Sequence, residues 1–369
     1  MNLSQALSRK GNNFDLVRLV AAILVVWCHA YLMQPNDPAI DPLGTALGFD
    51  GLGSLGVYAF FLMSGILVTA SYDRQRSAPR FIALRVARLW PAVAGGSLFA
   101  IFVIGPLFTT LPLSEYFASH TTWMNLDNAS TLAFKRGWVL PGVFEHNRFE
   151  RDICAPLWTL PLEVRCYLIV LVAGVLGLLS SRRGVFVAVA MGLVAFAVRV
   201  RFAPFELSLR DFSEKAGGYS FWPELFFMGG MLLYSWRDRV HINGLAATAF
   251  LMIFLVFRDT AAAQPLFYVT FVYGVLWTGS TPALRRFVPR NDYSFGIYIY
   301  GFMMQQSVAS VAPHLNHVQA TLVAAPFILL CAAASWHFVE RPVLAWCRGR
   351  LARETVHPVP AIAADSAAR

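Results

Sequence analysis

The sequence predicts an all-α protein, a polytopic bundle of about ten transmembrane helices with both termini in the cytoplasm. Hydrophobic residues make up 57% of its 369 residues and charged residues only 14%, whereas about 25% of an average soluble domain is charged. The apolar residues form continuous runs and do not alternate as they do in a transmembrane barrel. This composition excludes a disordered chain, a coiled coil and a disulfide scaffold.

Ten apolar segments are predicted membrane spans, because a helix needs about 20 mostly apolar residues to cross a bilayer. Their bounds are roughly residues 14–34, 53–71, 91–111, 156–179, 184–201, 219–236, 243–257, 264–280, 293–312 and 318–339.

The distribution of basic residues sets the expected orientation. With the N-terminus in the cytoplasm, 19 of the 30 Lys and Arg fall in cytoplasmic segments, and the first external loop, 35–52, has no Lys or Arg. Cytoplasmic loops of membrane proteins carry this excess. We therefore attribute the net charge of +9 to membrane topology and expect no nucleic-acid partner.

Two segments outside the spans have expected roles. Residues 112–155 form a long external loop, and a loop of that length is usually functional or covers a site. Residues 344–369 are expected to be a cytoplasmic, disordered tail. The five cysteines form no CxxC pair and no metal-like spacing with His, so we expect no metal site.

Ionisable side chains inside spans are costly, and each is a functional candidate. In the first span Arg18 and His29 are eleven residues apart, so they share a helix face and lie about 16 Å apart along the axis. Asp15 is close enough to pair with Arg18. The alternative interpretation is a structural histidine in a helix interface and an arginine that extends to the membrane surface.

The second span and the segment after it supply a small-residue contact and a basic pair. Ser64 and Gly65 allow another helix to approach, and Ser64 can donate a hydrogen bond across that contact. Arg85 and Arg88 share one face at the cytoplasmic boundary and suit a phosphate clamp, although ordinary positive-inside charge or lipid contact would give the same pair. Pro91 is expected to open the third span.

The fourth span brings Glu163 into an apolar run, with Tyr167 one turn later on the same face. The alternative for Glu163 is an ion pair with Arg165 or Arg18 that holds helices together. Trp158 lies at interfacial depth, where an aromatic belt is also expected.

Polar residues mark the last two spans as well. The ninth span has a polar face made of Tyr298, Tyr300, Gln305 and Gln306. In the last span, Pro342 follows Glu340 and Arg341 and is expected to stop the helix.

Together these segments resemble the acyltransferase-3 family of bacterial membrane O-acyltransferases. The resemblance covers residues 12–343, which would form one membrane-embedded domain. The matching residues are Arg18 and His29, then Phe60, Phe61, Ser64 and Gly65, then Arg85, Arg88, Trp90 and Pro91, then Trp158, Thr159, Leu160, Glu163 and Tyr167, then Ser294, Phe295, Gly296 and Tyr298, and finally Glu340 and Pro342.

Two positions depart from the family pattern. Many members have an acidic residue before the Phe pair, where this chain has Tyr58 and Ala59, and many have a late His where this chain has Tyr300 and Gly301. His29 is therefore left as the main candidate for a base.

The resemblance implies transfer of an acyl group, commonly acetyl, from cytoplasmic acyl-CoA to a hydroxyl of a saccharide or glycolipid, such as a unit of a surface polysaccharide or exopolysaccharide. It implies a multi-pass protein of the bacterial inner membrane, in contact with membrane lipids. Acyl-CoA would be a co-substrate, and no cofactor would be bound permanently.

Each site residue receives an expected role from that resemblance. His29 and Glu163 would be catalytic, with His29 as the general base. Arg18, Arg85 and Arg88 would bind the donor. The acceptor-binding or supporting residues would be Asp15, Phe61, Ser64, Trp158, Tyr167 and Tyr298.

A non-enzymatic transporter or flippase of a lipid-linked or small polar substrate is the alternative, because it too would have buried charges and broken helices. Two features count against it. The chain has no paired Gly- or Pro-interrupted spans in corresponding halves, and the pair Arg85 and Arg88 is one-sided.

Overall fold

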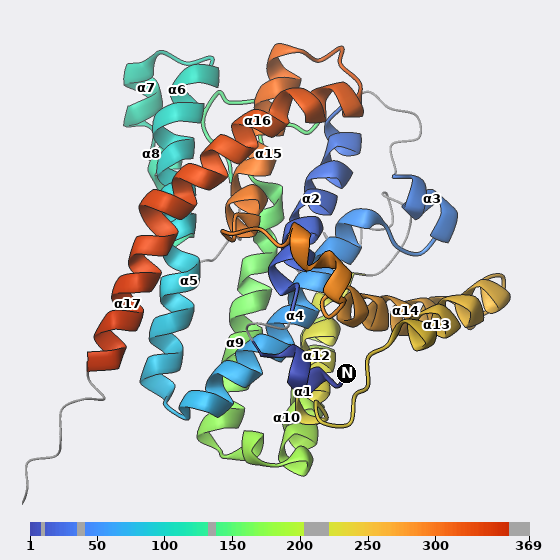
Figure 1. Ribbon diagram of the computed structural model, residues 1–369. Coiled ribbons are helices and arrows are strands. Elements are labelled where there is room, and N and C mark those ends of the chain that lie inside the picture. The colour runs from blue at the N-terminus through green and yellow to red at the C-terminus, as the bar shows by residue number, and fades with distance from the viewer. Residues whose placement is uncertain (9–11, 35–40, 132–137, 203–220, 354–369) are drawn as a thin grey trace, which may run out of the picture.

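The computed structural model describes residues 1–8, 12–34, 41–131, 138–202 and 221–353, and every regular element in these ranges is a helix (Figure 1). Each of the ten predicted spans overlaps one of them. These helices are α2 (Phe14–Met33), α4 (Leu52–Gln75), α5 (Ala78–Phe99), α9 (Leu160–Val175), α10 (Arg182–Phe202), α12 (Pro223–Ser235), α13 (Gly244–Phe257), α14 (Ala263–Thr278), α15 (Ser294–Val311) and α16 (His317–Ser335).

Shorter helices connect or extend these ten. They are α1 (Leu3–Ala6), α3 (Pro42–Leu47), the π-helix η1 (Ala100–Ile104), α6 (Gly105–Phe108), α7 (Leu113–Ala118), α8 (His120–Thr131), the 3₁₀ helices η2 (Ala155–Thr159), η3 (Leu178–Ser180) and η4 (Pro282–Phe287), the π-helix η5 (Trp336–Glu340), and α17 (Arg341–Arg353).

Five continuous helical stretches in the described part of the chain are long and apolar enough to cross a membrane. They are Phe14–Met33, Leu52–Gln75, Ala78–Phe108, Ala155–Val175 and His317–Arg353. The protein is therefore an all-helical, multi-pass membrane protein in its described part. The total of ten spans and the cytoplasmic location of both termini stay predictions.

The centre of the bundle is formed by α2, α4 and α15. Helix α4 packs against α2 and α12, while α15 packs against α2 and α16. Helices α5 and α9 contact each other, and both pack against α4. The hairpin of α13 and α14 packs mainly on itself and projects from the side of the bundle (Figure 1).

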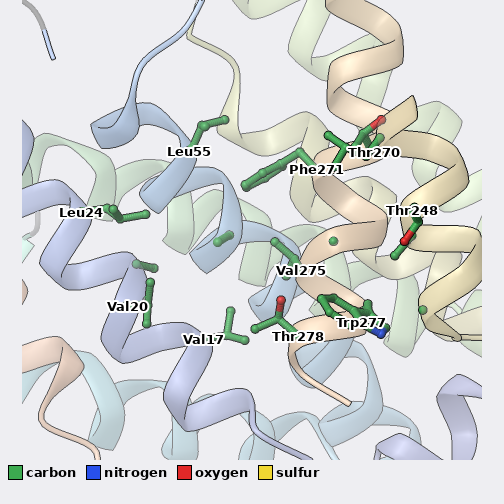
Figure 2. Close-up of a pocket in the computed structure, with 16 residues that line it drawn as sticks. Val17, Val20, Leu24, Leu55, Thr248, Thr270, Phe271, Val275, Trp277 and Thr278 are labelled. Atoms are coloured by element: carbon green, nitrogen blue, oxygen red, sulfur yellow. The ribbon is translucent and has the colours of Figure 1, made fainter. Parts of the chain in front are cut away.

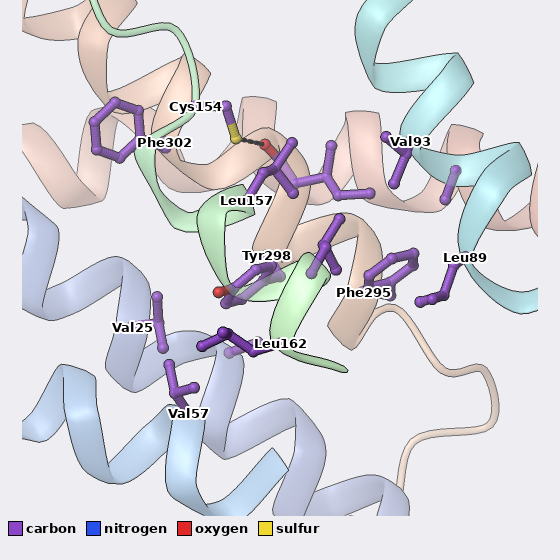
Figure 3. Close-up of a cluster of buried hydrophobic side chains, with 14 of the residues drawn as sticks. Val25, Val57, Leu89, Val93, Cys154, Leu157, Leu162, Phe295, Tyr298 and Phe302 are labelled. Atoms are coloured by element: carbon purple, nitrogen blue, oxygen red, sulfur yellow. Dashed lines mark hydrogen bonds between the residues drawn. The ribbon is translucent and has the colours of Figure 1, made fainter. Parts of the chain in front are cut away.

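Apolar side chains from these central helices meet in one cluster, part of which is drawn in Figure 3. Val25 of α2, Val57 of α4, Leu162 of α9 and Tyr298 of α15 are all buried in it. The interior between the central helices is therefore apolar and has a low dielectric constant.

Glycine residues allow two of the central helices to touch backbone to backbone. A Cβ atom on Gly65 of α4 would lie 2.1 Å from the carbonyl oxygen of Phe227 in α12, and a Cβ on Gly230 would lie 2.4 Å from the carbonyl oxygen of Leu62. No other residue fits at this distance without a shift of the helices. Gly65, which was predicted to admit a neighbouring helix, does so against α12.

Two prolines do not bound helices as the sequence predicted. Helix α5 begins at Ala78, and Pro91 lies inside it instead of opening the span. Likewise, Pro342 does not stop the last helix, which continues from α16 through η5 and α17 to Arg353. Proline in a membrane helix is tolerated because its φ is helical and neighbouring groups satisfy the carbonyl that it leaves without a donor. The wide π-turn of η5 ends at Glu340, two residues before Pro342.

The predicted loop and tail are partly helical. Residues 112–155 contain α7 and α8 before a non-helical stretch, and the Tyr116 hydroxyl ties α7 to the carbonyl of Ile101 at 2.9 Å. The tail predicted over 344–369 begins as helix, because residues 344–353 belong to α17, and its remainder from residue 354 lies outside the described residues. The segment between the predicted spans 184–201 and 219–236 lies almost wholly outside them as well.

We expect Gly65→Ala to lower the free energy of unfolding by about 1–3 kcal/mol, because the new methyl group would overlap a backbone carbonyl. Gly229→Ala in α12 is the matched control, since a Cβ there meets no atom within 4 Å. Thermal unfolding of both variants in detergent measures the difference. Equal midpoints for the two variants would contradict the close contact of α4 and α12.

Candidate functional site

A cavity of about 70 Å³ lies where α2, α4, α5, α9 and α15 meet. Seven predicted site residues line it, namely Arg18, Phe61, Ser64, Arg88, Glu163, Tyr167 and Tyr298. The remaining lining residues are Val57, Phe60, Leu89, Thr159, Leu160 and Phe295. The structure thus brings together residues that are up to 280 positions apart in the sequence.

A larger groove of about 590 Å³ lies between α2, α4 and the α13–α14 hairpin (Figure 2). Its lining is almost entirely apolar, with Leu24, Val275 and Trp277 among the residues drawn. It contains none of the predicted site residues. The smaller cavity is therefore the better candidate for chemistry, because it combines charges, a carboxylate and hydroxyl groups.

Glu163 is held by two hydroxyl groups in the cavity. The Tyr167 hydroxyl donates to Glu163 Oε1 from one turn along α9, as the spacing predicted, and Ser64 Oγ of α4 donates to the same oxygen at 3.5 Å. The alternative of an ion pair between Glu163 and Arg165 or Arg18 is not seen in the described residues. Arg165 is exposed, and Arg18 pairs with Asp292. The two hydroxyl groups orient Glu163 across the contact between α4 and α9.

Arg18 pairs with Asp292, not with Asp15 as the sequence predicted. Asp15 is exposed on α2, whereas Arg18 points inward and its Nη1 donates to Asp292 Oδ2 at 2.6 Å. Arg88 of α5 donates from Nη2 to the same oxygen at 2.7 Å. Arg18 pairs with Asp292, 274 residues away in the sequence, because Asp292 is inside the bundle. An unpaired guanidinium group is most costly there.

Glu340 is a second carboxylate beside Arg88. Its Oε2 lies 3.7 Å from Arg88 Nη1, and its Oε1 accepts a hydrogen bond from Ser335 at 3.0 Å. The side chain is 1% exposed, at the end of the π-helix η5. Glu340 thus helps to neutralise the charge of Arg88.

Asp292 stands just before α15, outside the membrane-spanning segments. Burial alone would raise its pKa, but the Arg18 and Arg88 guanidinium groups, with hydrogen bonds from Ser294, lower the pKa below its ordinary value. The carboxylate is therefore ionised at neutral pH, as its two ion pairs require. Sequence reasoning missed Asp292, although an acid next to the basic segment that ends at Arg290 was a usable signal.

Arg85 and Arg88 have different surroundings despite their spacing of one turn. The Arg85 guanidinium lies over the rings of Phe81 and Tyr167, at 5.7 and 5.6 Å from the ring centres. Arg88 faces Asp292 and Glu340 and lies 5.5 Å from the ring centre of Phe295. Arg85 is thus next to the cavity through Tyr167, while Arg88 lines it.

His29 lies further along α2 and does not line the cavity. Its Nδ1 is 2.7 Å from the carbonyl oxygen of Val25, and its ring meets Phe302 edge to face at 5.3 Å. Because a carbonyl can only accept, Nδ1 carries the proton and Nε2 of the neutral ring keeps its lone pair. This is the tautomer that a general base needs.

Gln305 of α15 lies beside His29. Its Nε2 donates to the carbonyl of Val26 at 2.8 Å, so the carboxamide and the imidazole occupy consecutive carbonyl groups of α2, which are about 4 Å apart. Gln305 Oε1 is buried and accepts no hydrogen bond from the described residues. Polar side chains of α2 and α15 therefore bind neighbouring carbonyl groups at this end of α2.

Tyr298 and Trp158 complete the account of the predicted residues. The Tyr298 hydroxyl donates to the carbonyl of Pro156 at 2.8 Å and lies 2.7 Å from Thr159 Oγ1, which joins α15 to η2. Trp158 packs edge to face on Phe221 at 5.3 Å and stays outside the cavity lining. In the described residues, no group of three His, Cys, Asp or Glu is placed to hold a metal ion.

Comparisons with known proteins cover nearly the whole chain. A family model described as "Acyltransferase domain" matches residues 12–336. The chain is 28% identical over 347 residues to the O-acetyl transferase of Shigella phage Sf6, which covers 91% of this chain and 96% of that protein. It is also 28% identical over 362 residues to Nodulation protein 10 of Rhizobium leguminosarum bv. viciae, with 90% and 93% covered. No solved structure matches it.

We expect Arg88→Met to lower the free energy of unfolding by roughly 3 kcal/mol, because it removes the ion-pair partner of the buried Glu340 and one of the two partners of Asp292. Arg85→Met is the matched control from the same helix turn. It removes contacts with two aromatic rings, which are worth about 0.5–1 kcal/mol each. Chemical or thermal unfolding in detergent compares the two, and an equal loss in both variants would contradict the different environments of these arginines.

Proposed function

The chain belongs to the acyltransferase-3 family, as its sequence motifs suggested, and from that premise we propose that it is a membrane O-acyltransferase that moves an acetyl group from acyl-CoA to a hydroxyl of a saccharide. The name of the phage relative, O-acetyl transferase, supports acetyl as the acyl group and oxygen as the acceptor atom. The saccharide acceptor and the inner-membrane location follow from the family resemblance.

The observation that carries this proposal is the cavity that Arg18, Arg88, Glu163 and Tyr167 line inside an apolar bundle. An acyl-CoA has phosphates at one end and a thioester at the other, so its binding needs cations and, some distance away, hydrogen-bond donors. The cavity supplies the cations through Arg18 and Arg88, and the polar groups around His29 lie about 16 Å further along α2. The low-dielectric surroundings of the cavity strengthen every electrostatic interaction made inside it.

The basic residues are assigned to the donor. Guanidinium groups recognise phosphate oxygens through paired N–H donors. Arg85 and Arg88 occupy the end of α5 that is predicted to face the cytoplasm, where acyl-CoA is found. Arg18 approaches the same region from α2. His29 is eleven residues further along α2, a rise of about 16 Å, so the extended pantetheine arm would connect the two ends.

His29 is assigned as the general base. Its Nε2 takes the proton from the acceptor hydroxyl, whose oxygen attacks the thioester carbonyl and forms a tetrahedral intermediate. The intermediate collapses with cleavage of the C–S bond, and the departing CoA thiolate receives the proton from the imidazolium. Gln305, held beside His29 on α2, is a hydrogen-bond acceptor for a further hydroxyl of the incoming saccharide.

Ser64 and Tyr167 are assigned as supporting residues that hold Glu163 in the wall of the cavity, because each hydroxyl group donates its single proton to this carboxylate. We assign Glu163 a supporting part in the chemistry. Its described contacts do not reach His29, so orientation of the imidazole falls to the Val25 carbonyl and the Phe302 ring.

The test uses purified protein in lipid vesicles, acetyl-CoA labelled on the acetyl group, and a glycan extract of the source cells. We expect His29→Ala to lower kcat by at least about 100-fold, because general base catalysis contributes 10²–10⁴-fold. Arg85→Ala should mainly raise the KM for acetyl-CoA. His241→Ala, an exposed histidine outside the spans, is the control and should retain transfer.

If His29→Ala transfers the acetyl group at the wild-type rate, His29 is not the general base. Absence of both CoA binding and transfer in the wild type would overturn the acyltransferase proposal.

A further inference from the structure

Asp292 connects the two arginines that line the cavity. A single oxygen, Oδ2, accepts hydrogen bonds from Arg18 at 2.6 Å and from Arg88 at 2.7 Å. The other oxygen, Oδ1, accepts the backbone N–H of Ser294 at 3.3 Å and also its hydroxyl. One carboxylate before α15 thus fixes a side chain of α2 and a side chain of α5.

This arrangement restrains side chains that would otherwise be mobile. An arginine has four rotatable side-chain bonds and loses much rotamer freedom when it is held in one geometry. The Arg18, Arg88 and Asp292 side chains are 22%, 15% and 11% exposed, so solvent does not replace their mutual contacts. The two guanidinium groups therefore keep their positions before any ligand arrives.

The guanidinium groups retain donors for a further anion. Each guanidinium has five N–H donors. Arg18 gives one nitrogen to Asp292, and Arg88 gives one to Asp292 and directs another toward Glu340. Arg18 and Arg88 both line the cavity, and Asp292 and Glu340 beside it balance the charges of these two arginines. Attraction of an anion to this site then depends on the placement of N–H groups more than on net charge.

We propose that Asp292 is a positioning residue for the donor, which holds Arg18 and Arg88 so that their remaining N–H groups meet the phosphate-bearing part of acyl-CoA. This inference rests on the proposed function. It assigns the recognition of phosphate to an arrangement of three side chains, from α2, from α5 and from the segment before α15. Asp292 acts through the arginines and does not touch the reacting atoms.

Two donors distinguish this positioning from a general structural role. Acetyl-CoA carries the phosphates, whereas S-acetylpantetheine has the same thioester arm without phosphates. The wild type should prefer acetyl-CoA, measured as the ratio of the two kcat/KM values. In Asp292→Asn we expect this ratio to fall about tenfold or more, mainly through the KM for acetyl-CoA, since a charge-assisted contact to phosphate is lost. A general loss of structure would lower kcat/KM for both donors together.

Three further variants sharpen the test. Ser294→Ala keeps the carboxylate charge but removes a hydrogen bond that orients it, so the ratio should shift less and in the same direction. Asp292→Glu restores the charge and should recover part of the preference. Asp152→Asn is the control, because Asp152 is a carboxylate in the 138–154 segment that accepts a backbone N–H and forms no ion pair with the described residues.

Each outcome decides the inference. An unchanged ratio in Asp292→Asn, or a lower KM for acetyl-CoA because the released arginines bind phosphate more tightly, would overturn it. If Asp292→Asn does not fold, Ser294→Ala decides, and an unchanged ratio there overturns it too. A wild type that uses neither donor would instead overturn the proposed function.

Discussion

Pairing of charge inside an apolar bundle is the constraint on which this structure depends. A guanidinium group within a membrane protein is costly unless a carboxylate neutralises it. Arg18 and Arg88 satisfy that need through one shared carboxylate, Asp292, and Arg88 also faces Glu340. These contacts join α2, α5, the segment before α15, and η5. The cavity lies beside these ion pairs, so the same groups that stabilise the bundle place cations where a donor would bind.

Close packing of the helices makes this pairing possible. Gly65 lets the backbones of α4 and α12 touch, and a Cβ on Gly296 would lie 2.7 Å from Cα of Ala332, so α15 and α16 also pack closely. Without an aqueous hydrophobic effect between membrane helices, such close contacts supply much of the association energy. They also fix the register of α4 and α15, which carry Ser64 and Tyr298 into the cavity.

Local patterns were predictable from the sequence, and long-range partners were not. One-turn spacing correctly placed Glu163 and Tyr167 in contact, and apolar length correctly located helices at all ten segments. Spacing also predicted an ion pair of Arg18 with Asp15. Arg18 instead pairs with Asp292, which lies inside the bundle and which no local rule connects to α2. Pro91 and Pro342 were misjudged for a similar reason, because the packing around a membrane helix can offset the hydrogen bond that proline removes. The ring contacts of Arg85 likewise depend on the fold.

In the proposed reaction both substrates bind along α2, with the donor's phosphates near Arg18 and the acceptor hydroxyl near His29 and Gln305. The most direct test of this arrangement is the sidedness of transfer in vesicles that hold the protein in one known orientation. Labelled acetyl-CoA would be confined to the side of the Arg85 end of α5 and the saccharide to the opposite side. The account predicts that label crosses to the saccharide in the wild type and does not cross in His29→Ala. Transfer only when both substrates share one side would contradict it.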